Sequence, residues 1–248
     1  PKKYKNISND QDGRRKRKAS ANKALSVFKA ALNQAYQDER VLSDEGWRRV
    51  KPFRKVDEAK VRYLNNDESR RLINTCDPDF SQLVKAALLT GCRYGELTAL
   101  LCSDLNIESG TIYIRESKSG KPRSVPLNDE GIEFLTSITA GKNETDRIFT
   151  RADGMPWGSS HQRRRLNDAA IRVGISDVSF HILRHTYGSA LAMQGVPMAV
   201  IAAALGHSDT RMTEKHYAAL APNYVADTIR THLPKLGVTG DQNVIRIK

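Results

Sequence analysis

The stretch that decides the fold is SQLVKAALLTGCRYGELTALLCSDL, residues 81–105. Its first half spaces apolar side chains three and four residues apart, as on one face of an α-helix, and Gly91 is a typical helix stop. The second half repeats the helical spacing with leucines at 97, 100 and 101. The stretch therefore predicts a helix, a break at Gly91 and a second helix over 95–105.

The apolar period changes directly after these helices. In GTIYIRESKSGKPRSVPL, residues 110–127, Ile112 and Ile114 alternate with polar residues, and the alternation resumes at Val125 after a cluster of Ser, Gly, Lys and Pro. A period of two indicates β-strands and the cluster indicates a turn. We predict a β-hairpin with a basic turn.

Helical spacing returns after the hairpin, with Gly195 and Gly206 as stops. The expected helices cover residues 129–138, 160–173, 180–194, 197–205, 210–219 and 223–233. A doubly wound parallel sheet needs several strands between its helices, and this chain lacks them. We therefore predict a mainly α fold with one small antiparallel β-hairpin or sheet, of the α+β class.

The N-terminal part has a different character. The first residues are basic and nearly free of large apolar side chains, so we expect them to be flexible, whereas apolar spacing from Ala21 predicts a helix to about Gln37. One helix cannot bury such a stripe alone. We expect a flexible basic segment, the end of a helical domain with its linker, a main domain and a C-terminal tail, over 1–19, 20–60, 61–235 and 236–248.

The composition favours a polyanionic partner. The 248 residues include 40 Lys and Arg against 28 Asp and Glu, a formal net charge of +12. Such an excess attracts nucleic acid or an anionic membrane surface. A mean hydropathy of −0.54 and the lack of an apolar run near the roughly 20 residues that span a bilayer disfavour a membrane. Nucleic acid is the leading expectation.

The cysteines and the N-terminus bear on the compartment. Three cysteines without paired ligand spacing favour neither a disulfide framework nor a zinc site, and no secretory signal is visible. A reducing cytoplasm, bacterial or of a phage-infected host, fits best. The start at Pro1 without an initiator Met suggests a fragment or a processed chain.

A basic cluster follows a predicted turn at SFHILRH, residues 179–185. Ordinary basic or core-satisfied side chains, a metal site and a phosphate cradle are the three interpretations of His181, Arg184 and His185. A metal site is disfavoured, because Arg184 places a fixed cation there and the Glu of an HExxH motif is missing. On this stretch alone, core histidines are the commonest outcome.

Two further segments contain residues suited to phosphate chemistry. In TGCRYGEL, Arg93 follows the helix-ending glycine, and Glu96 lies one helical turn on, where a carboxylate can orient a neighbour. In ALGHSDTRMTEKHY, His207 follows Gly206, and Tyr217 comes ten residues later. Each feature is commonplace when it stands alone.

Taken in order, four segments resemble the tyrosine recombinase family, the integrases of phages and mobile elements. The resemblance implies a tyrosine-recombinase-type catalytic domain from about residue 62 to the C-terminal helix, and it implies that 20–37 is the end of a DNA-clamping domain. The four segments are TGCRYGELTALLCSDL, ESKSGKPRSVPL, HILRHTYGSALAMQGV and LGHSDTRMTEKHYA, within residues 90–218.

The resemblance implies a phosphoryl-transfer site without a metal. Two guanidinium groups would stabilise the charge that develops on the non-bridging phosphate oxygens, and Tyr217 would attack to form a 3′-phosphotyrosyl link. The implied catalytic residues are Arg93, Lys118, His181, Arg184, His207 and Tyr217.

Each remaining residue has an implied role. His181 would accept a proton, His207 would donate a hydrogen bond to a phosphate oxygen, and Lys118 would protonate the leaving 5′-hydroxyl. Lys121 is a rival for that last role, and two solvated turn lysines are the alternative. His185 and His216 lie beside matched positions and are interpreted as structural.

The resulting expectation is a site-specific DNA recombinase that needs no cofactor and lacks a GxxxxGK[ST] nucleotide motif. Its implied partners are double-stranded DNA attachment sites, copies of itself in a synaptic tetramer, and DNA-bending or directionality accessory proteins, with no membrane. The C-terminal tail has three alternative interpretations. It docks on a neighbouring subunit, it forms a short strand at NVIRI, or it is a free end.

Three other functions are weighed against this expectation. A type IB topoisomerase shares the nucleophile and the cations, but the linear pattern from LGHS to HYA favours the recombinase. A non-catalytic DNA-binding module would lose part of the set, yet all six positions are filled. A metal-dependent nuclease would need a compact acidic ligand cluster, which does not accompany the basic one.

Overall fold

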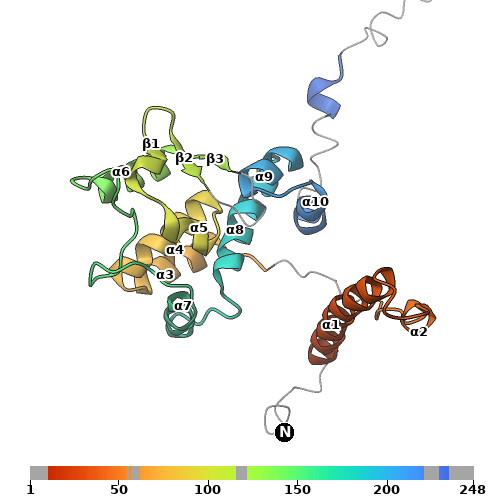
Figure 1. The fold of residues 1–248 in the computed structure, drawn as a ribbon. Coiled ribbons are helices and arrows are strands. Elements are labelled where there is room, and N and C mark those ends of the chain that lie inside the picture. The colour runs from red at the N-terminus through yellow and green to blue at the C-terminus, as the bar shows by residue number, and fades with distance from the viewer. Residues whose placement is uncertain (1–10, 55, 57–61, 116–121, 221–228, 235–248) are drawn as a thin grey trace, which may run out of the picture. The chain divides into compact units, whose positions relative to one another are not determined.

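The computed structural model describes residues 11–54, 56, 62–115, 122–220 and 229–234. The chain divides into two compact units, Pro1–Lys60 and Val61–Lys248, whose helices and strands are labelled in Figure 1. None of the helices within the described ranges combines the length and the apolarity that a bilayer span requires.

The first unit contains a long helix, α1 (Gln11–Gln37), and a short one, α2 (Glu45–Arg48). The chain after α1 returns along it, because Asn22 exchanges two hydrogen bonds with the Phe53 backbone, at 2.8 and 2.9 Å. Residues 11–19, which were expected to belong to a flexible segment over 1–19, are helical in this structure. Lysine and arginine form helices well without producing an apolar period.

The second unit is built mainly from helices. Two of them, α4 (Pro78–Thr90) and α8 (Phe180–Met193), pack together in the core. Rings of Phe80 and Phe180 lie 5.9 Å apart at an edge-on angle. The other α-helices are α3 (Asn66–Thr75), α5 (Tyr94–Ala99), α6 (Asp129–Thr139), α7 (His161–Arg172), α9 (Met198–Leu205) and α10 (Arg211–Tyr217).

A small antiparallel sheet lies at one side of this unit (Figure 1). Its strands are β1 (Leu105–Asn106), β2 (Thr111–Ile114) and β3 (Arg123–Pro126), in the order β1-β2-β3. Ile112 pairs with Val125, and both are fully buried. The predicted fold class, mainly helical with a small antiparallel sheet, is confirmed. The hairpin turn, 116–121, is outside the described residues.

The helices after the hairpin begin and end within two residues of their predicted bounds, except the last. Of the helix expected over 223–233, residues 223–228 lie outside the described ranges and residues 229–232 are helical. The tail over 236–248 also lies outside them. Short 3-10 turns, η2 (Cys102–Asp104) and η3 (Ala218–Leu220), follow α5 and α10.

The second helix predicted over 95–105 is wrong beyond Ala99. There Leu101 forms an isolated antiparallel bridge with Arg147, and its N–H donates to the side chain of Asp104 at 2.9 Å. These contacts replace the next helical hydrogen bonds, so the chain turns into η2 and β1. Tertiary pairing overrides the leucine spacing at this point.

One helix, α3, was not anticipated, although the sequence contains its start signal. Asn65 Oδ1 accepts from the Glu68 N–H at 2.8 Å, and Glu68 Oε2 accepts from the Asn65 N–H at 2.9 Å. This reciprocal capping box satisfies two backbone donors that a helix start otherwise leaves unpaired.

Replacing Asn65 tests this helix start. Asn65→Ala removes the side-chain acceptor, so we expect the free energy of unfolding to fall by about 1 kcal/mol, measured by urea titration. Asn65→Asp keeps an acceptor at the same place and should retain most of the stability. Equal losses in the two variants would show that the cap is not what stabilises α3.

Candidate active site

Arg184, on α8, is a buried cation held by main-chain carbonyls. Arg184 is only 3% exposed. Its Nη1 donates to the Gly91 carbonyl at 2.9 Å, and its Nη2 donates to the Leu205 carbonyl. Burial, and then the charge of Arg93, lower its pKa to about 10, so it stays protonated at neutral pH. The two carbonyls belong to the C-terminal ends of α4 and α9, where the helix dipoles place negative charge.

Those two helix ends also position two other predicted residues. Gly91 and Gly206 are the C-caps of α4 and α9, and both have φ of 64°, a left-handed conformation that favours glycine. Arg93 follows the first cap by two residues, and His207 follows the second directly. The sequence thus folds both segments back beside Arg184.

Arg93 is oriented by Glu96, as the one-turn spacing predicted. Its Nη1 donates to Glu96 Oε1 at 2.7 Å, and its backbone N–H donates to Oε2 at 2.9 Å. Burial alone raises the pKa of Glu96, but hydrogen bonds from Arg123 and from the Arg93 backbone lower it below its usual value. The carboxylate is therefore ionised, while the Arg93 side chain remains 32% exposed.

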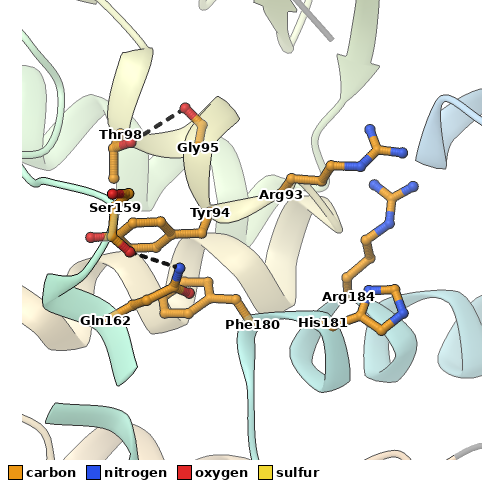
Figure 2. Close-up of a pocket in the computed structure, with 9 residues that line it drawn as sticks. All are labelled: Arg93, Tyr94, Gly95, Thr98, Ser159, Gln162, Phe180, His181 and Arg184. Carbon is orange, nitrogen blue, oxygen red and sulfur yellow. Dashed lines mark hydrogen bonds between the residues drawn. The ribbon is translucent and has the colours of Figure 1, made fainter. Parts of the chain in front are cut away.

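Arg93, His181 and Arg184 line one cavity of about 410 Å³. Figure 2 shows the two guanidinium groups near each other, with the imidazole of His181 beside Arg184. Like charges at such a separation repel unless an anion lies between them. The other lining residues are Tyr94, Gly95, Thr98, Ser159, Gln162 and Phe180.

His207 is half-buried and belongs to the same electrostatic environment. Its Nδ1 is 2.8 Å from Thr213 Oγ1, which leaves Nε2 as the ring nitrogen that can donate to a phosphate oxygen. Burial, and then the charges of Arg184 and Arg93, lower its pKa to about 4. The imidazole is therefore neutral at pH 7.

Tyr217 is withdrawn from solvent and does not line the cavity. It is 1% exposed, and its ring packs against Gly188, where an added Cβ would lie 2.6 Å from Cζ. Its hydroxyl is 2.8 Å from Nδ1 of His185. Burial raises the pKa of Tyr217 to about 12, although the charge of Arg184 opposes that shift.

His185 connects this tyrosine to the cavity. Its Nε2 is 3.0 Å from Nε2 of His181, so hydrogen bonds run from Tyr217 through His185 to His181. Burial, and then the charge of His181, lower the pKa of His185 to about 4. Partial burial, and then the charge of Arg184, also lower the pKa of His181.

The predicted residues therefore divide into three groups. Arg93, His181 and Arg184 meet in one cavity, His207 lies within their electrostatic field, and Tyr217 reaches them through hydrogen bonds. Lys118 lies outside the described residues, as does its rival Lys121.

Sequence reasoning missed two residues of the site. His185 was interpreted as structural, although its spacing of four from His181 already placed both rings on one helix face. Arg123 shares the inward face of β3 with Val125, and an arginine at a buried strand position signals a carboxylate partner.

No part of the chain that the structure describes gathers three or more His, Cys, Asp or Glu side chains in a position to hold a metal ion. Cys76, Cys92 and Cys102 are all free thiols. The positive charge in the cavity comes from arginine side chains.

Comparison with known proteins agrees with this geometry. A family model described as the phage integrase family matches residues 62–223. The chain belongs to the phage integrase family. The resemblance inferred from the four sequence segments is confirmed.

Similar proteins include two phage integrases. The integrase of Escherichia phage 186 is 28% identical over 225 residues, which cover 89% of this chain and 62% of that protein. The integrase of Salmonella phage P22 is 30% identical over 220 residues, which cover 83% of this chain and 55% of that protein. The chain thus spans somewhat more than half the length of these curated relatives.

A solved structure supports the same assignment. The catalytic domain of bacteriophage HP1 integrase is 28% identical and superimposes with a TM-score of 0.56. The match covers 73% of this chain and 100% of that domain. The second unit therefore has the fold of a phage integrase catalytic domain.

The two low histidine pKa values predict a dependence of stability on pH. Unfolded histidines take up protons near pH 6.5, whereas His185 and His207 resist protonation in the folded state until about pH 4. The unfolded state then binds more protons, so the free energy of unfolding should fall as pH is lowered from 7 to 5. Urea titrations at intervals across that window would measure the slope.

A variant isolates one of these contributions. His207→Asn should reduce the slope of the free energy of unfolding against pH between pH 7 and pH 5. The reduction should correspond to up to about one proton fewer taken up on unfolding. The window lies above the ordinary pKa of the carboxylates, which keeps them out of the comparison. A slope identical to that of the parent would contradict the neutral, buried state of His207.

Proposed function

We propose that this chain is the strand-cleaving and rejoining part of a site-specific DNA recombinase. The observation that carries the proposal is the pair of guanidinium groups, Arg93 and Arg184, beside His181 in one cavity of a phage integrase family member. A net charge of +12 supports DNA as the substrate.

In this proposal the scissile phosphate binds between the two arginines. Guanidinium stays protonated and presents a planar fork to phosphate oxygens, so Arg93 and Arg184 stabilise the charge that grows on the non-bridging oxygens. His207 donates a further hydrogen bond through Nε2. These preorganised donors take the place of a divalent cation.

Tyr217 is the proposed nucleophile. Its oxygen forms a bond to phosphorus as the bond to the 5′ oxygen breaks, which leaves a 3′-phosphotyrosyl link. While Tyr217 is buried, its hydroxyl bonds to Nδ1 of His185, and Nε2 of His185 bonds to His181. Once α10 has moved, His181, which lines the cavity, is the proposed acceptor of the phenolic proton. The low pKa values keep both rings neutral, as an acceptor must be.

The buried hydroxyl sets a condition on this step. Because Tyr217 is 1% exposed and outside the cavity lining, α10 has to shift before the oxygen can reach a phosphate held by the arginines. The attack is therefore proposed to follow DNA binding and a displacement of α10.

Lys118 is proposed to protonate the leaving 5′ oxygen. Because the phosphotyrosyl link keeps the energy of the phosphodiester, rejoining requires no nucleotide and the proposed reaction has no cofactor. The same site, run in reverse, restores the DNA strand.

The family resemblance supports the remaining assignments. We propose double-stranded attachment sites as substrate, a synaptic tetramer of this protein on DNA, DNA-bending or directionality accessory proteins and a cytoplasmic location. Residues 20–60 are proposed as the end of a DNA-clamping region with its linker, and residues 61–235 as the catalytic domain.

Removing the phenolic hydroxyl tests the nucleophile. Tyr217→Phe should lose about 1 kcal/mol of stability with its hydrogen bond to His185 and bind DNA as the parent does. It should form no covalent adduct on a nicked substrate whose cleaved fragment diffuses away. Adduct is measured as protein–DNA species that survive detergent.

The matched control is Tyr187→Phe, on α8, which should form adduct at the rate of the parent. Peptide mapping of the parent adduct should place the phosphate on Tyr217. An adduct from Tyr217→Phe, or a link to Tyr187 or Tyr224, would mean that the nucleophile is misassigned.

A modified leaving group tests the hairpin lysines. Lys118→Ala should slow cleavage of ordinary DNA by about a hundredfold or more, and a substrate with sulfur at the leaving 5′ position should restore the rate, because a thiolate leaves without a proton. Lys121→Ala should lose mainly DNA affinity, with a shallower dependence on salt. Rescue of Lys121→Ala alone would reverse the two roles.

A further inference from the structure

Arg123 is a buried arginine that contacts two segments of the site at once. It begins β3, and its side chain is 10% exposed. Nη2 donates to Glu96 Oε2 at 2.8 Å and Nη1 donates to Oε1 at 3.1 Å, a two-pronged pairing. Nε donates to the Ala204 carbonyl at 3.2 Å. One guanidinium therefore joins the sheet to the start of α5 and the end of α9.

The contact with Glu96 determines how Arg93 is held. Each oxygen of Glu96 accepts one hydrogen bond from Arg93 and one from Arg123. The carboxylate is 4% exposed, so water cannot replace a missing donor. Without Arg123, the carboxylate would be left with a single cation and would be free to turn with it, which moves Arg93 relative to the cavity.

The contact between Arg123 and the end of α9 helps to hold the turn that carries His207. Arg123 and Arg184 bind successive carbonyls, those of Ala204 and Leu205, immediately before the turn that presents His207. Arg123 also packs against that turn, because a Cβ added at Gly206 would lie 2.9 Å from its Nη1.

We propose that Arg123 is a positioning residue that fixes Arg93 and His207 relative to each other around the phosphate. It acts through Glu96 and the end of α9 and does not contact DNA. The kinetic test of this inference measures the formation of covalent adduct and therefore rests on the proposed function. A second readout, the mobility of Arg93, is independent of activity.

The chain offers a control in Arg115, a more exposed arginine that also pairs with a buried carboxylate. Its Nε donates at 2.5 Å to Asp104, whose side chain is 4% exposed, as is that of Glu96. Arg115→Met and Arg123→Met each remove a guanidinium from a buried carboxylate. The Arg123 side chain is 10% exposed and that of Arg115 is 53% exposed, so we expect Arg123→Met to lose more stability. Both variants are therefore compared at a temperature at which each is fully folded, which separates folding from positioning.

The kinetic test compares these variants with saturating nicked DNA. Arg123→Met should form covalent adduct about tenfold or more slowly than Arg115→Met, because misplaced groups lose transition-state contacts. The DNA concentration for half-maximal rate should change by less than about threefold. Arg123→Lys, which keeps the charge and loses the fork, should recover part of the rate.

A coupling measurement distinguishes positioning from general damage. Arg93→Lys should slow adduct formation strongly in the parent and in Arg115→Met. In Arg123→Met the same change should cost less, because Arg93 is already misplaced and the two effects are not additive. Full additivity would count against the proposed link through Glu96.

Nuclear magnetic resonance of ¹⁵N-arginine-labelled protein gives the readout that needs no reaction. The Nε–H order parameter of Arg93, assigned with Arg93→Lys, should fall toward the flexible range below about 0.6 in Arg123→Met and stay unchanged in Arg115→Met. An unchanged Arg93 signal in Arg123→Met overturns the inference. If the parent forms no adduct while the Arg93 signal behaves as expected, the proposed function fails and the positioning role stands.

Discussion

The site depends on the way in which the buried charge of Arg184 is satisfied. A cation taken out of water is costly unless it is bonded, and here the acceptors are two main-chain carbonyls at the ends of α4 and α9. Carbonyls solvate the guanidinium without cancelling its charge, as a carboxylate would. The Glu96 carboxylate pairs with both Arg93 and Arg123, so its single negative charge neutralises only one of the two guanidinium charges. The cavity therefore keeps an excess of positive charge, which favours an anion.

Charge and proton transfer are assigned to different side chains. Arg184, with a pKa of about 10, stays protonated at neutral pH, whereas burial and the neighbouring positive charges keep His185 and His207 neutral. One physical cause, a desolvated cluster of cations, thus produces both the excess of positive charge and the neutral imidazoles beside it. The left-handed glycines Gly91 and Gly206 make this arrangement possible, because they turn the chain back toward Arg184 within two residues.

The sequence predicted those parts of the fold and site that depend on local pattern. Gly91 was recognisable as a helix stop, and the family resemblance implied that Arg93 and Arg184 meet in one site. Helix α5 ends early because Leu101 pairs with Arg147, a partner 46 positions away that no local period reveals. The burial of Tyr217 and the inward role of Arg123 depend on how α10 and β3 pack. The start of α1 was missed because its basic residues form a helix without an apolar stripe.

The absence of a side chain at Gly188 of α8 bears on how often the Tyr217 hydroxyl leaves its buried position. The ring of Tyr217 occupies the space that any side chain at position 188 would fill, so packing, together with the hydrogen bond to His185, keeps the hydroxyl in its buried position. The fraction of molecules with an available hydroxyl is then a property of the small apolar cluster that contains Ile201 and Leu205. Under the proposed function, substitutions among those packing residues would change the rate of cleavage while the side chains that line the cavity stay the same.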